Sequence, residues 1–301
     1  MSDTRETDAT VAVPQIAVDD LAVERNLDRI RERVAALPDR VDVAVFPEYA
    51  LTGFVADSRI ADAALPRETA LDRLSSVAGD HGVSVVAGYA ERGGDGDSGD
   101  LFNATAYVPG EKRGGGGPAQ PESAVYRKRH LWGDESDLVT PGTDRVVVET
   151  PAGSTGLMTC YDLNFVAESA WFTERAVDAL FVPGAWPASH AANWRLLLRA
   201  RALDGVRWVV GAGRTGTAGR DGEGAHGDGR SPQDGSRSAQ DGSRSDDADP
   251  HTYAGNSLVA GPDGQVVAEL DRGERDLIAT LDGETLDAQR DLVGSVAGEK
   301  K

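Results

Sequence analysis

The chain has 301 residues, of which 50 are Asp or Glu and 31 are Lys or Arg, so its formal net charge at pH 7 is −19. Lysine is rare: it occurs only at positions 112, 128, 300 and 301, and arginine supplies the remaining positive charge. This balance argues against nucleic acid and membrane surfaces as partners, because both require clustered positive charge. An acidic, lysine-poor surface suits a cytoplasm rich in salt, where screening weakens self-repulsion.

The ends and the apolar runs of the chain point to a soluble, cytoplasmic protein. The first residues, Met-Ser-Asp-Thr-Arg-Glu-Thr-Asp, are polar and acidic, unlike the basic and then apolar segments of a secretory signal. No apolar run approaches the ~20 residues that a membrane helix needs. A single cysteine in the whole chain fits a reducing compartment.

Short valine-rich runs with the lengths of strands recur along the chain and are bounded by Gly, Pro or Asp. Strands that alternate with helices over the first two thirds indicate an α/β architecture. The runs near the C-terminal end add antiparallel or edge pairing. The predicted strands cover residues 11–18, 41–47, 83–90, 145–149, 155–160, 179–185, 207–213, 256–261, 266–270 and 276–281.

Amphipathic patterns between these runs predict helices. The first pattern is the clearest, because Val23, Leu27, Ile30 and Val34 recur at helical spacing and stop before Pro38. Further helices are predicted around residues 71–77, 168–180 and 193–205.

Glycine-rich stretches interrupt this pattern at residues 92–100 and 111–121, where we expect extended hairpin loops. The longest, residues 217–250, contains no apolar side chain larger than alanine except proline and is predicted to be a disordered insertion. Sheet-like sequence resumes after it, so we predict one domain over residues 10–285. The flanking residues, 1–9 and 286–301, are predicted to be flexible.

The stretch VVGAGRTG at residues 209–216 satisfies the G-x-G-x-x-G pattern of dinucleotide-binding sites and follows a predicted strand. In those sites the last glycine opens a helix whose N-terminus holds the pyrophosphate. Here the chain continues as TAGRDGEGAHGDGR, which is too rich in glycine to form a helix. We therefore expect these glycines to end a strand and turn the chain.

The lone cysteine, Cys160, lies in the stretch GLMTCYDLNF. It cannot form a disulfide within its own chain, nor a multi-cysteine zinc site. Two interpretations remain: a small buried apolar side chain or a nucleophile. A catalytic thiol needs a base, donors for the oxyanion and an acid for the departing amine. The five histidines lie in no known cysteine-protease context.

Candidates for the catalytic acid and for the cation at the oxyanion come from residues other than histidine. In VAVFPEYALTGF, Glu48 follows an apolar strand, and ligands bind at the carboxyl ends of strands in α/β sheets. Cys160 ends a predicted strand in the same way. In AVYRKRH, strand alternation places Lys128 on one face with Tyr126, and this lysine stands between two arginines. A compact point charge in a chain that otherwise uses arginine suggests a specific role.

Three blocks, FPEYALTGF, YRKRHLWGDESDLVTPG and GLMTCYDLNF, resemble in order and separation the signature blocks of the nitrilase superfamily, the carbon–nitrogen hydrolases. Later segments, including VDALFVPGAWP and YAGNSLVAGPDGQVVAEL, are also similar, so the resemblance covers roughly residues 10–282, interrupted by the stretch at 217–250. It implies an α/β fold of four layers, an αββα sandwich with two sheets between layers of helices. It also implies a homodimer or a higher homo-oligomer.

The resemblance implies roles for five residues. Glu48 is expected to act as general base and acid, Lys128 to stabilise the tetrahedral intermediate, and Cys160 to attack. Glu135 is the second glutamate, which positions the substrate, and the backbone N–H of Tyr161 joins Lys128 at the oxyanion. The expected reaction releases ammonia or an amine, leaves a thioester and ends with hydrolysis.

The substrate is expected to be a small amide. Superfamily members that cleave nitriles tend to carry Trp-Glu after the cysteine, whereas this chain has Tyr161-Asp162, as in the amidase, ω-amidase and carbamoylase branches. Tyr49, Trp132 and Trp186 are expected to line the substrate site with Tyr161. An N-carbamoyl amino acid amidohydrolase and a nitrilase are the alternatives within the superfamily.

The chain departs from those branches at several positions. Asn164 stands where they commonly have arginine, Val166-Ala167-Glu168 replaces a shorter Pro-Glu step, and Asp204-Gly205 replaces Glu-Asn. The loss of an arginine weakens the case for a substrate that bears a carboxylate.

Two alternatives come from other classes of protein. One is a catalytically silent scaffold, which the intact set of catalytic residue types disfavours. The other is a nucleotide-dependent enzyme, which the missing helix after GAGRTG disfavours. No His-Glu-x-x-His or clustered-ligand pattern is present, and we expect neither a metal nor a cofactor.

Overall fold

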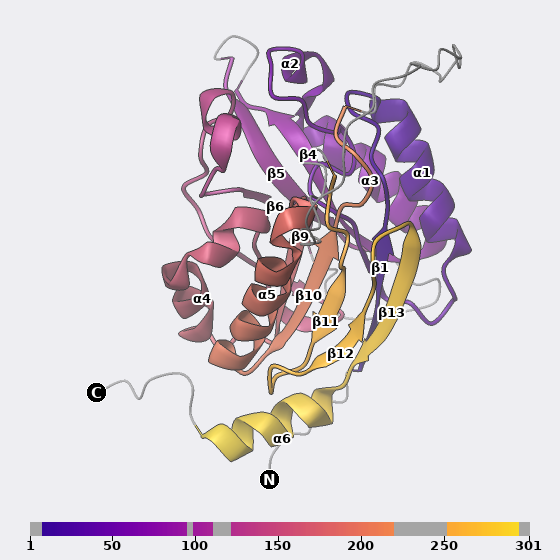
Figure 1. The fold of residues 1–301 in the computed structure, drawn as a ribbon. Coiled ribbons are helices and arrows are strands. Elements are labelled where there is room, and N and C mark those ends of the chain that lie inside the picture. Colours follow the sequence, from indigo (N-terminus) through magenta and orange to yellow (C-terminus); the bar gives the residue numbers. More distant parts are fainter. Residues whose placement is uncertain (1–7, 95–98, 111–121, 220–251, 295–301) are drawn as a thin grey trace, which may run out of the picture.

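The computed structural model describes residues 8–94, 99–110, 122–219 and 252–294. These segments form two β-sheets with helices on both sides (Figure 1). Three predictions fall largely outside the described residues. They are the disordered insertion at 217–250, the hairpin loop at 111–121 and the flexibility of the outermost terminal residues.

The first sheet has the strand order β13-β1-β2-β4-β5-β6, with β3 added beside β4. Strands β1, β2 and β4 are parallel, and β13, β5 and β6 pair antiparallel to their neighbours. Their bounds are β1 Ala9–Gln15, β2 Val43–Val45, β3 Leu65–Pro66, β4 Ser84–Arg92, β5 Leu101–Val108, β6 Ala124–Arg127 and β13 Arg275–Leu281.

The second sheet has the strand order β12-β11-β10-β9-β8-β7. Its central strands β8, β9 and β10 are parallel, and the outer pairs are antiparallel. Their bounds are β7 Val146–Thr150, β8 Gly153–Leu157, β9 Ala179–Gly184, β10 Trp208–Gly213, β11 Leu258–Ala260 and β12 Val266–Glu269.

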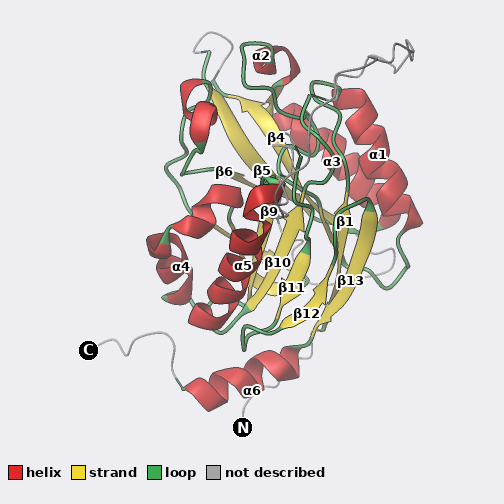
Figure 2. Ribbon diagram, in the orientation of Figure 1, coloured by secondary structure: helices red, strands yellow, loops and turns green. Residues whose placement is uncertain are grey.

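Helices cover the outer faces of the two sheets (Figure 2). Helices α1 and α3 pack on the first sheet, and α4 and α5 pack on the second. The helices are α1 Val23–Ala36, α2 Ile60–Ala63, α3 Arg67–His81, α4 Val166–Thr173, α5 Ala191–Gly205 and α6 Gly283–Val293. Short 3₁₀ turns are η1 Gly133–Asp137, η2 Cys160–Asn164 and η3 Ala188–His190.

The alternation of side chains along the strands explains the layers. On β1, Val11 and Val13 point to the core between the sheets, where they join Phe181 and Val210 of the second sheet. Ala12, between them, faces the layer of α1 and α3. Because successive side chains point to opposite faces, a strand buried on both faces is apolar throughout. The fold is the predicted αββα sandwich.

Several predicted elements require correction. Strand β5 Leu101–Val108 was not predicted, although all its residues are buried. The predicted helix over 168–180 ends at Thr173, and the predicted strand over 155–160 ends at Leu157. The segment from residue 286, expected to be flexible, continues helix α6 as far as Val293.

Helix α6 is held by both of its ends and by one apolar contact. The Asp282 side chain accepts a hydrogen bond from the Thr285 backbone, which caps the helix N-terminus. Leu286 is buried against the core between the sheets, and Arg290 pairs with Asp178 at 2.8 Å. The sequence pattern did not predict this helix, because the segment is rich in charged residues and buries only one leucine, Leu286.

The GAGRTG stretch behaves as predicted from its glycines. Strand β10 ends at Gly213, and no helix follows it through residue 219, where the described segment ends. A Cβ atom at Gly213 would lie 1.8 Å from the Gly255 carbonyl oxygen, so this glycine permits close packing of two backbone segments. Among the described helices, none combines the length and the apolar character needed to cross a bilayer.

Candidate active site

Four of the residues predicted to be catalytic line one cavity of about 170 Å³. Glu48 lies in the turn after β2, Lys128 directly follows β6, Glu135 lies in η1, and Cys160 is the first residue of η2. The turn after β2 and the turn η2 come from different sheets. The sandwich therefore brings together residues that are far apart in the sequence. Asn103 and Glu135 are 32 positions apart, and Glu48 and Cys160 are 112 positions apart.

Lys128 joins the two glutamates. Its ammonium nitrogen lies 2.8 Å from Glu48 Oε1 and 2.7 Å from Glu135 Oε2, and all three side chains are more than nine-tenths buried. Burial alone would lower the pKa of Lys128, but the charges of Glu48 and Glu135 hold it well above its ordinary value. The lysine therefore carries a permanent positive charge beside the cysteine.

Glu135 is ionised and held from several sides. Burial would raise its pKa, but Lys128 and the hydrogen bonds from Asn103 and the Trp132 backbone keep the pKa below its ordinary value. Tyr49 donates to Glu135 Oε1 at 2.8 Å. Burial and the neighbouring carboxylates raise the pKa of Tyr49 well above its ordinary value, so its hydroxyl stays a donor.

Asn103 is a site residue that the sequence pattern missed. Its amide nitrogen donates to Glu48 Oε1 at 2.7 Å and to Glu135 Oε1 at 2.6 Å, so it holds both carboxylates. It projects from β5, the strand that was not predicted. One feature of the sequence could have pointed to Asn103: it is a polar residue within the apolar run LFNATAYV. A buried amide requires hydrogen-bond partners, so an asparagine in such a run indicates a buried polar contact.

The backbone is unusual at two site positions. Tyr49 has φ 55° and Cys160 has φ 49°, in the left-handed region that residues with a Cβ rarely occupy. A Cβ atom at Gly88 of β4 would lie 2.4 Å from the Tyr49 backbone nitrogen, so glycine is required for the turn after β2 to pack there. Such conformations persist only where the surrounding structure enforces them, and they gather at functional sites.

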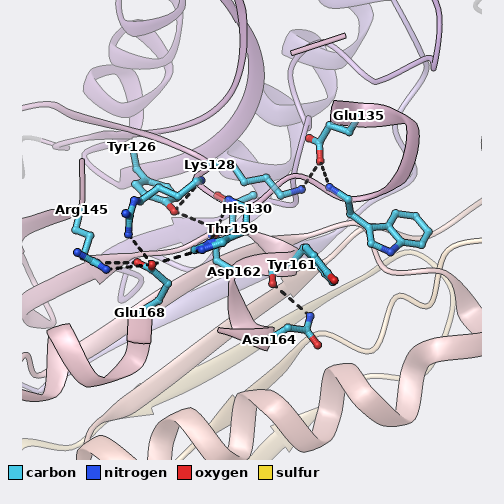
Figure 3. Close-up of polar contacts among 12 residues, drawn as sticks. Tyr126, Lys128, His130, Glu135, Arg145, Thr159, Tyr161, Asp162, Asn164 and Glu168 are labelled. Carbon is cyan, nitrogen blue, oxygen red and sulfur yellow. Dashed lines mark hydrogen bonds and ion pairs between the residues drawn. The ribbon is translucent and has the colours of Figure 1, made fainter. Parts of the chain in front are cut away.

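Asp162 enforces the conformation of the turn that carries Cys160 (Figure 3). It is fully buried and accepts hydrogen bonds from the Thr159 backbone at 3.0 Å and from the Tyr126 hydroxyl at 2.7 Å. The backbone N–H of His130 also donates to it, at 3.0 Å, and the His130 ring lies 2.9 Å away. The turn is thereby tied to the segment that follows β6, which carries Lys128.

Glu168 explains one of the departures from the family pattern. It is buried at the start of α4 and pairs with Arg129 at 2.5 Å and with Arg145 at 2.8 Å (Figure 3). The longer Val166-Ala167-Glu168 step therefore places a carboxylate against two arginines.

The Cys160 thiol is protonated in the resting site. Burial raises its pKa well above the ordinary value, and the negative charge of Glu48 acts in the same direction. Lys128 and a hydrogen bond from the Ala185 backbone oppose this shift without overcoming it. Attack by sulfur therefore requires transfer of the thiol proton to a base, and Glu48, which lines the same cavity, is the candidate.

The raised pKa predicts how the thiolate absorbance depends on pH. In the folded protein, the ultraviolet difference between wild type and Cys160→Ala should show no thiolate step up to about pH 9, the ordinary value for the thiol. The same difference in urea should show that step. Above about pH 9 the unfolded chain binds fewer protons than the folded one, so Cys160 should lower stability as pH rises. A thiolate step near neutral pH in the folded protein would contradict the prediction.

A second cavity of about 190 Å³ lies against Cys160. Tyr161 and Trp186 line this second cavity, Tyr49 lines the first, and Trp132 lines both. All four residues predicted to contact substrate therefore face one of the two cavities. Arg214, from the GAGRTG stretch, and Tyr253 also line the first cavity, and sequence reasoning assigned neither of them to the site. In the described segments, no group of three or more His, Cys, Asp or Glu residues could hold a metal ion.

Comparisons with known proteins identify relatives of this chain. The sequence profile of the carbon–nitrogen hydrolase family matches residues 10–291. A hydrolase of Mycobacterium tuberculosis is 32% identical over 225 residues, which are 72% of this chain and 69% of that protein. An (R)-stereoselective amidase of a Pseudomonas species is 27% identical over 283 residues, 93% of this chain and 87% of that protein.

Solved structures show the same fold. Nit3 of Saccharomyces cerevisiae, a member of branch 10 of the nitrilase superfamily, superposes with a TM-score of 0.75 at 22% identity, over 100% of this chain and 98% of that one. The chain belongs to the carbon–nitrogen hydrolase family. It is a hydrolase that acts on carbon–nitrogen bonds.

Proposed function

We propose that the protein is a small-molecule amidase that releases ammonia through a thioester on Cys160. The observation that carries this proposal is the burial of Glu48, Lys128 and Cys160 around one cavity, with Lys128 in contact with both site glutamates. Each group meets one requirement of amide hydrolysis by a thiol: a base, a cation for the oxyanion, and a nucleophile.

The proposed reaction begins with transfer of the Cys160 thiol proton to Glu48 as sulfur attacks the amide carbon. The negative charge that develops on the amide oxygen is stabilised by the Lys128 ammonium and the Tyr161 backbone N–H. Glu48 then gives its proton to the amide nitrogen, the carbon–nitrogen bond breaks, and ammonia leaves. The acyl group remains on Cys160 as a thioester.

The second half of the reaction repeats these roles with water. Glu48 takes a proton from a water molecule, which attacks the thioester carbon, and Lys128 again stabilises the oxyanion. The carbon–sulfur bond breaks, the carboxylic acid leaves, and the sulfur regains its proton from Glu48. Glu135, fixed by Lys128, Asn103 and Tyr49, keeps the lysine in place and orients the amide.

Two features favour amides over nitriles. Tyr161-Asp162 follows the cysteine, as in the amidase branches that the sequence resembles. The Pseudomonas relative is named an amidase. Nitriles and N-carbamoyl amino acids remain the alternatives that the test must distinguish.

The test measures ammonia release from a panel of simple amides, ω-amides of dicarboxylates, N-carbamoyl amino acids and short nitriles. Because the net charge of −19 suggests a need for screening, the assay is run in concentrated potassium chloride. Turnover of amides, together with an acyl adduct on Cys160 detected by mass spectrometry, is the expected result. Turnover of nitriles alone would contradict the amidase assignment. If the folded protein released no ammonia from any of these compounds, the proposed amidase function would be contradicted.

A further inference from the structure

Cys160 lies between two cavities of different chemistry. The first contains the charged residues Glu48, Lys128 and Glu135. The second shares with it only Trp132, Cys160, Ala185 and Pro187. The scissile amide must reach Glu48 and Lys128 in the first cavity, and the second cavity, which also borders Cys160, offers space for a side group of the substrate.

The lining of the second cavity is aromatic and carries no fixed charge. Of its lining side chains, Trp186 and Cys160 are buried, whereas Trp132, Asn164, His190 and Asn193 are exposed. No Lys, Arg, Asp or Glu lines it in the described part of the chain. Besides the residues shared with the first cavity, the lining consists of Tyr161, Asn164, Trp186, His190 and Asn193.

Among the described residues, a carboxylate in this second cavity would meet no Lys or Arg side chain. Burying a charged group without a partner is costly, whereas burying a flat apolar group against aromatic rings is favourable. The arginine that lines the first cavity, Arg214, already donates to Asp20 at 2.7 Å and to the Val18 carbonyl at 3.0 Å. Asp20 therefore compensates part of its charge, and Arg214 does not line the second cavity, which has no Lys or Arg among its described lining residues.

The size of the second cavity fits a ring. Its volume is about 190 Å³, and a protein cavity of ~150 Å³ can hold benzene. Trp186 lines this cavity, and its ring nitrogen is buried without an acceptor among the described residues. Asn164 also lines it and donates from its amide to the Tyr161 carbonyl at 3.2 Å.

We propose that the second cavity binds an uncharged aromatic, or similarly flat, side group of the amide, and that Asn164 sets this preference. The inference rests on the proposed function, because it assumes that the bond cleaved lies at Cys160. It narrows the substrate class to neutral amides such as arylacetamides, and it makes ω-amides of dicarboxylates poor substrates.

The test compares kcat and KM for phenylacetamide and for succinamate, whose second end is a carboxylate. Wild type should prefer phenylacetamide in kcat/KM by about tenfold or more, which corresponds to ~1.4 kcal/mol. Asn164→Arg should reverse this preference, because it places a cation beside the second cavity. The KM for succinamate should fall, and the KM for phenylacetamide should rise. Asn164→Gln, which changes length without charge, is the matched control and should keep the wild-type preference.

Two outcomes would overturn the inference. Wild type that prefers succinamate would refute it and would indicate that Arg214, which has two nitrogens unpaired among the described residues, binds the carboxylate. An Asn164→Arg variant that is folded and keeps the wild-type preference would refute the role of Asn164.

A second readout does not depend on turnover. Cys160 is the only cysteine, so its alkylation by iodoacetamide can be followed by mass spectrometry. Phenylacetamide should slow the alkylation at lower concentration than succinamate does, and Asn164→Arg should reverse this order. If no amide is hydrolysed, the proposed function fails. The order of protection still decides whether the second cavity prefers a neutral group.

Discussion

Replacing Cys160 by Ala is expected to lower kcat/KM for the best amide by at least ~10⁴-fold, because no other group can form the acyl intermediate. The side chain is small and buried, so the loss of its sulfur should change the free energy of unfolding by only about 1 kcal/mol. Ammonia release and thermal unfolding of the same preparation provide the measurement. A variant that retains substantial turnover would exclude Cys160 as the nucleophile.

Glu48→Gln is the natural companion to this variant. It keeps the shape of the side chain and an acceptor for Lys128, but it removes the group that takes and returns the proton. Because the resting thiol is protonated, loss of the base should also reduce kcat severely, by ~10²–10⁴-fold.

The double variant tests whether the two residues act as one unit. If the thiol proton passes to Glu48, Cys160→Ala/Glu48→Gln should be no slower than Cys160→Ala alone. Additive losses would mean that the two residues contribute independently. That result would contradict proton transfer between them.

Much of the architecture could be predicted from the period of the apolar residues. The valines of β1 and the helix of Val23, Leu27, Ile30 and Val34 appear where the patterns placed them. Strand β5 was missed because its apolar run follows a glycine-rich stretch and contains Asn103 and Thr105, which the pattern treats as interruptions. Both side chains are buried, and each pairs with a residue far away in sequence.

The same limit applies to the site. Glu48, Lys128, Glu135 and Cys160 could be named from motifs, because each stands at the end of a strand or in a short block. The way in which Asn103 joins the two carboxylates could not be predicted from local pattern. It depends on the pairing of β5 between β4 and β6, and pairing between distant strands leaves no period in the sequence.

Replacing Lys128 by Met is expected to destroy both activity and part of the stability. The substitution leaves Glu48 and Glu135 buried, close to Asn103 and without their shared cation. Removing one partner of a buried ion pair costs about 3–5 kcal/mol, because the charge left behind has no compensation. Activity should fall with it, since Lys128 is the cation proposed for the oxyanion. Denaturant unfolding and ammonia release measure the two effects separately.

The pH dependence of this variant identifies the cause of its instability. In wild type, Lys128 helps to hold the pKa of Glu135 below its ordinary value, so the stabilisation is present near neutral pH and is lost as pH falls through that lowered pKa. Without Lys128, burial should raise the pKa of a carboxyl group, and the folded variant should bind a proton that the unfolded chain releases. The variant should therefore recover stability, relative to wild type, as the pH is lowered.

A triple variant separates stability from catalysis. Glu48→Gln/Lys128→Met/Glu135→Gln removes the whole buried charge cluster, and replacing such a cluster by neutral groups is often close to neutral for stability. We expect it to regain most of the free energy of unfolding that Lys128→Met loses and to remain inactive. If Lys128→Met were as stable as wild type at neutral pH, the charge of Lys128 would not be needed to compensate the two buried glutamates. If Lys128→Met kept its turnover, the oxyanion would be stabilised by the backbone N–H groups alone, and Lys128 would serve only to hold the two glutamates.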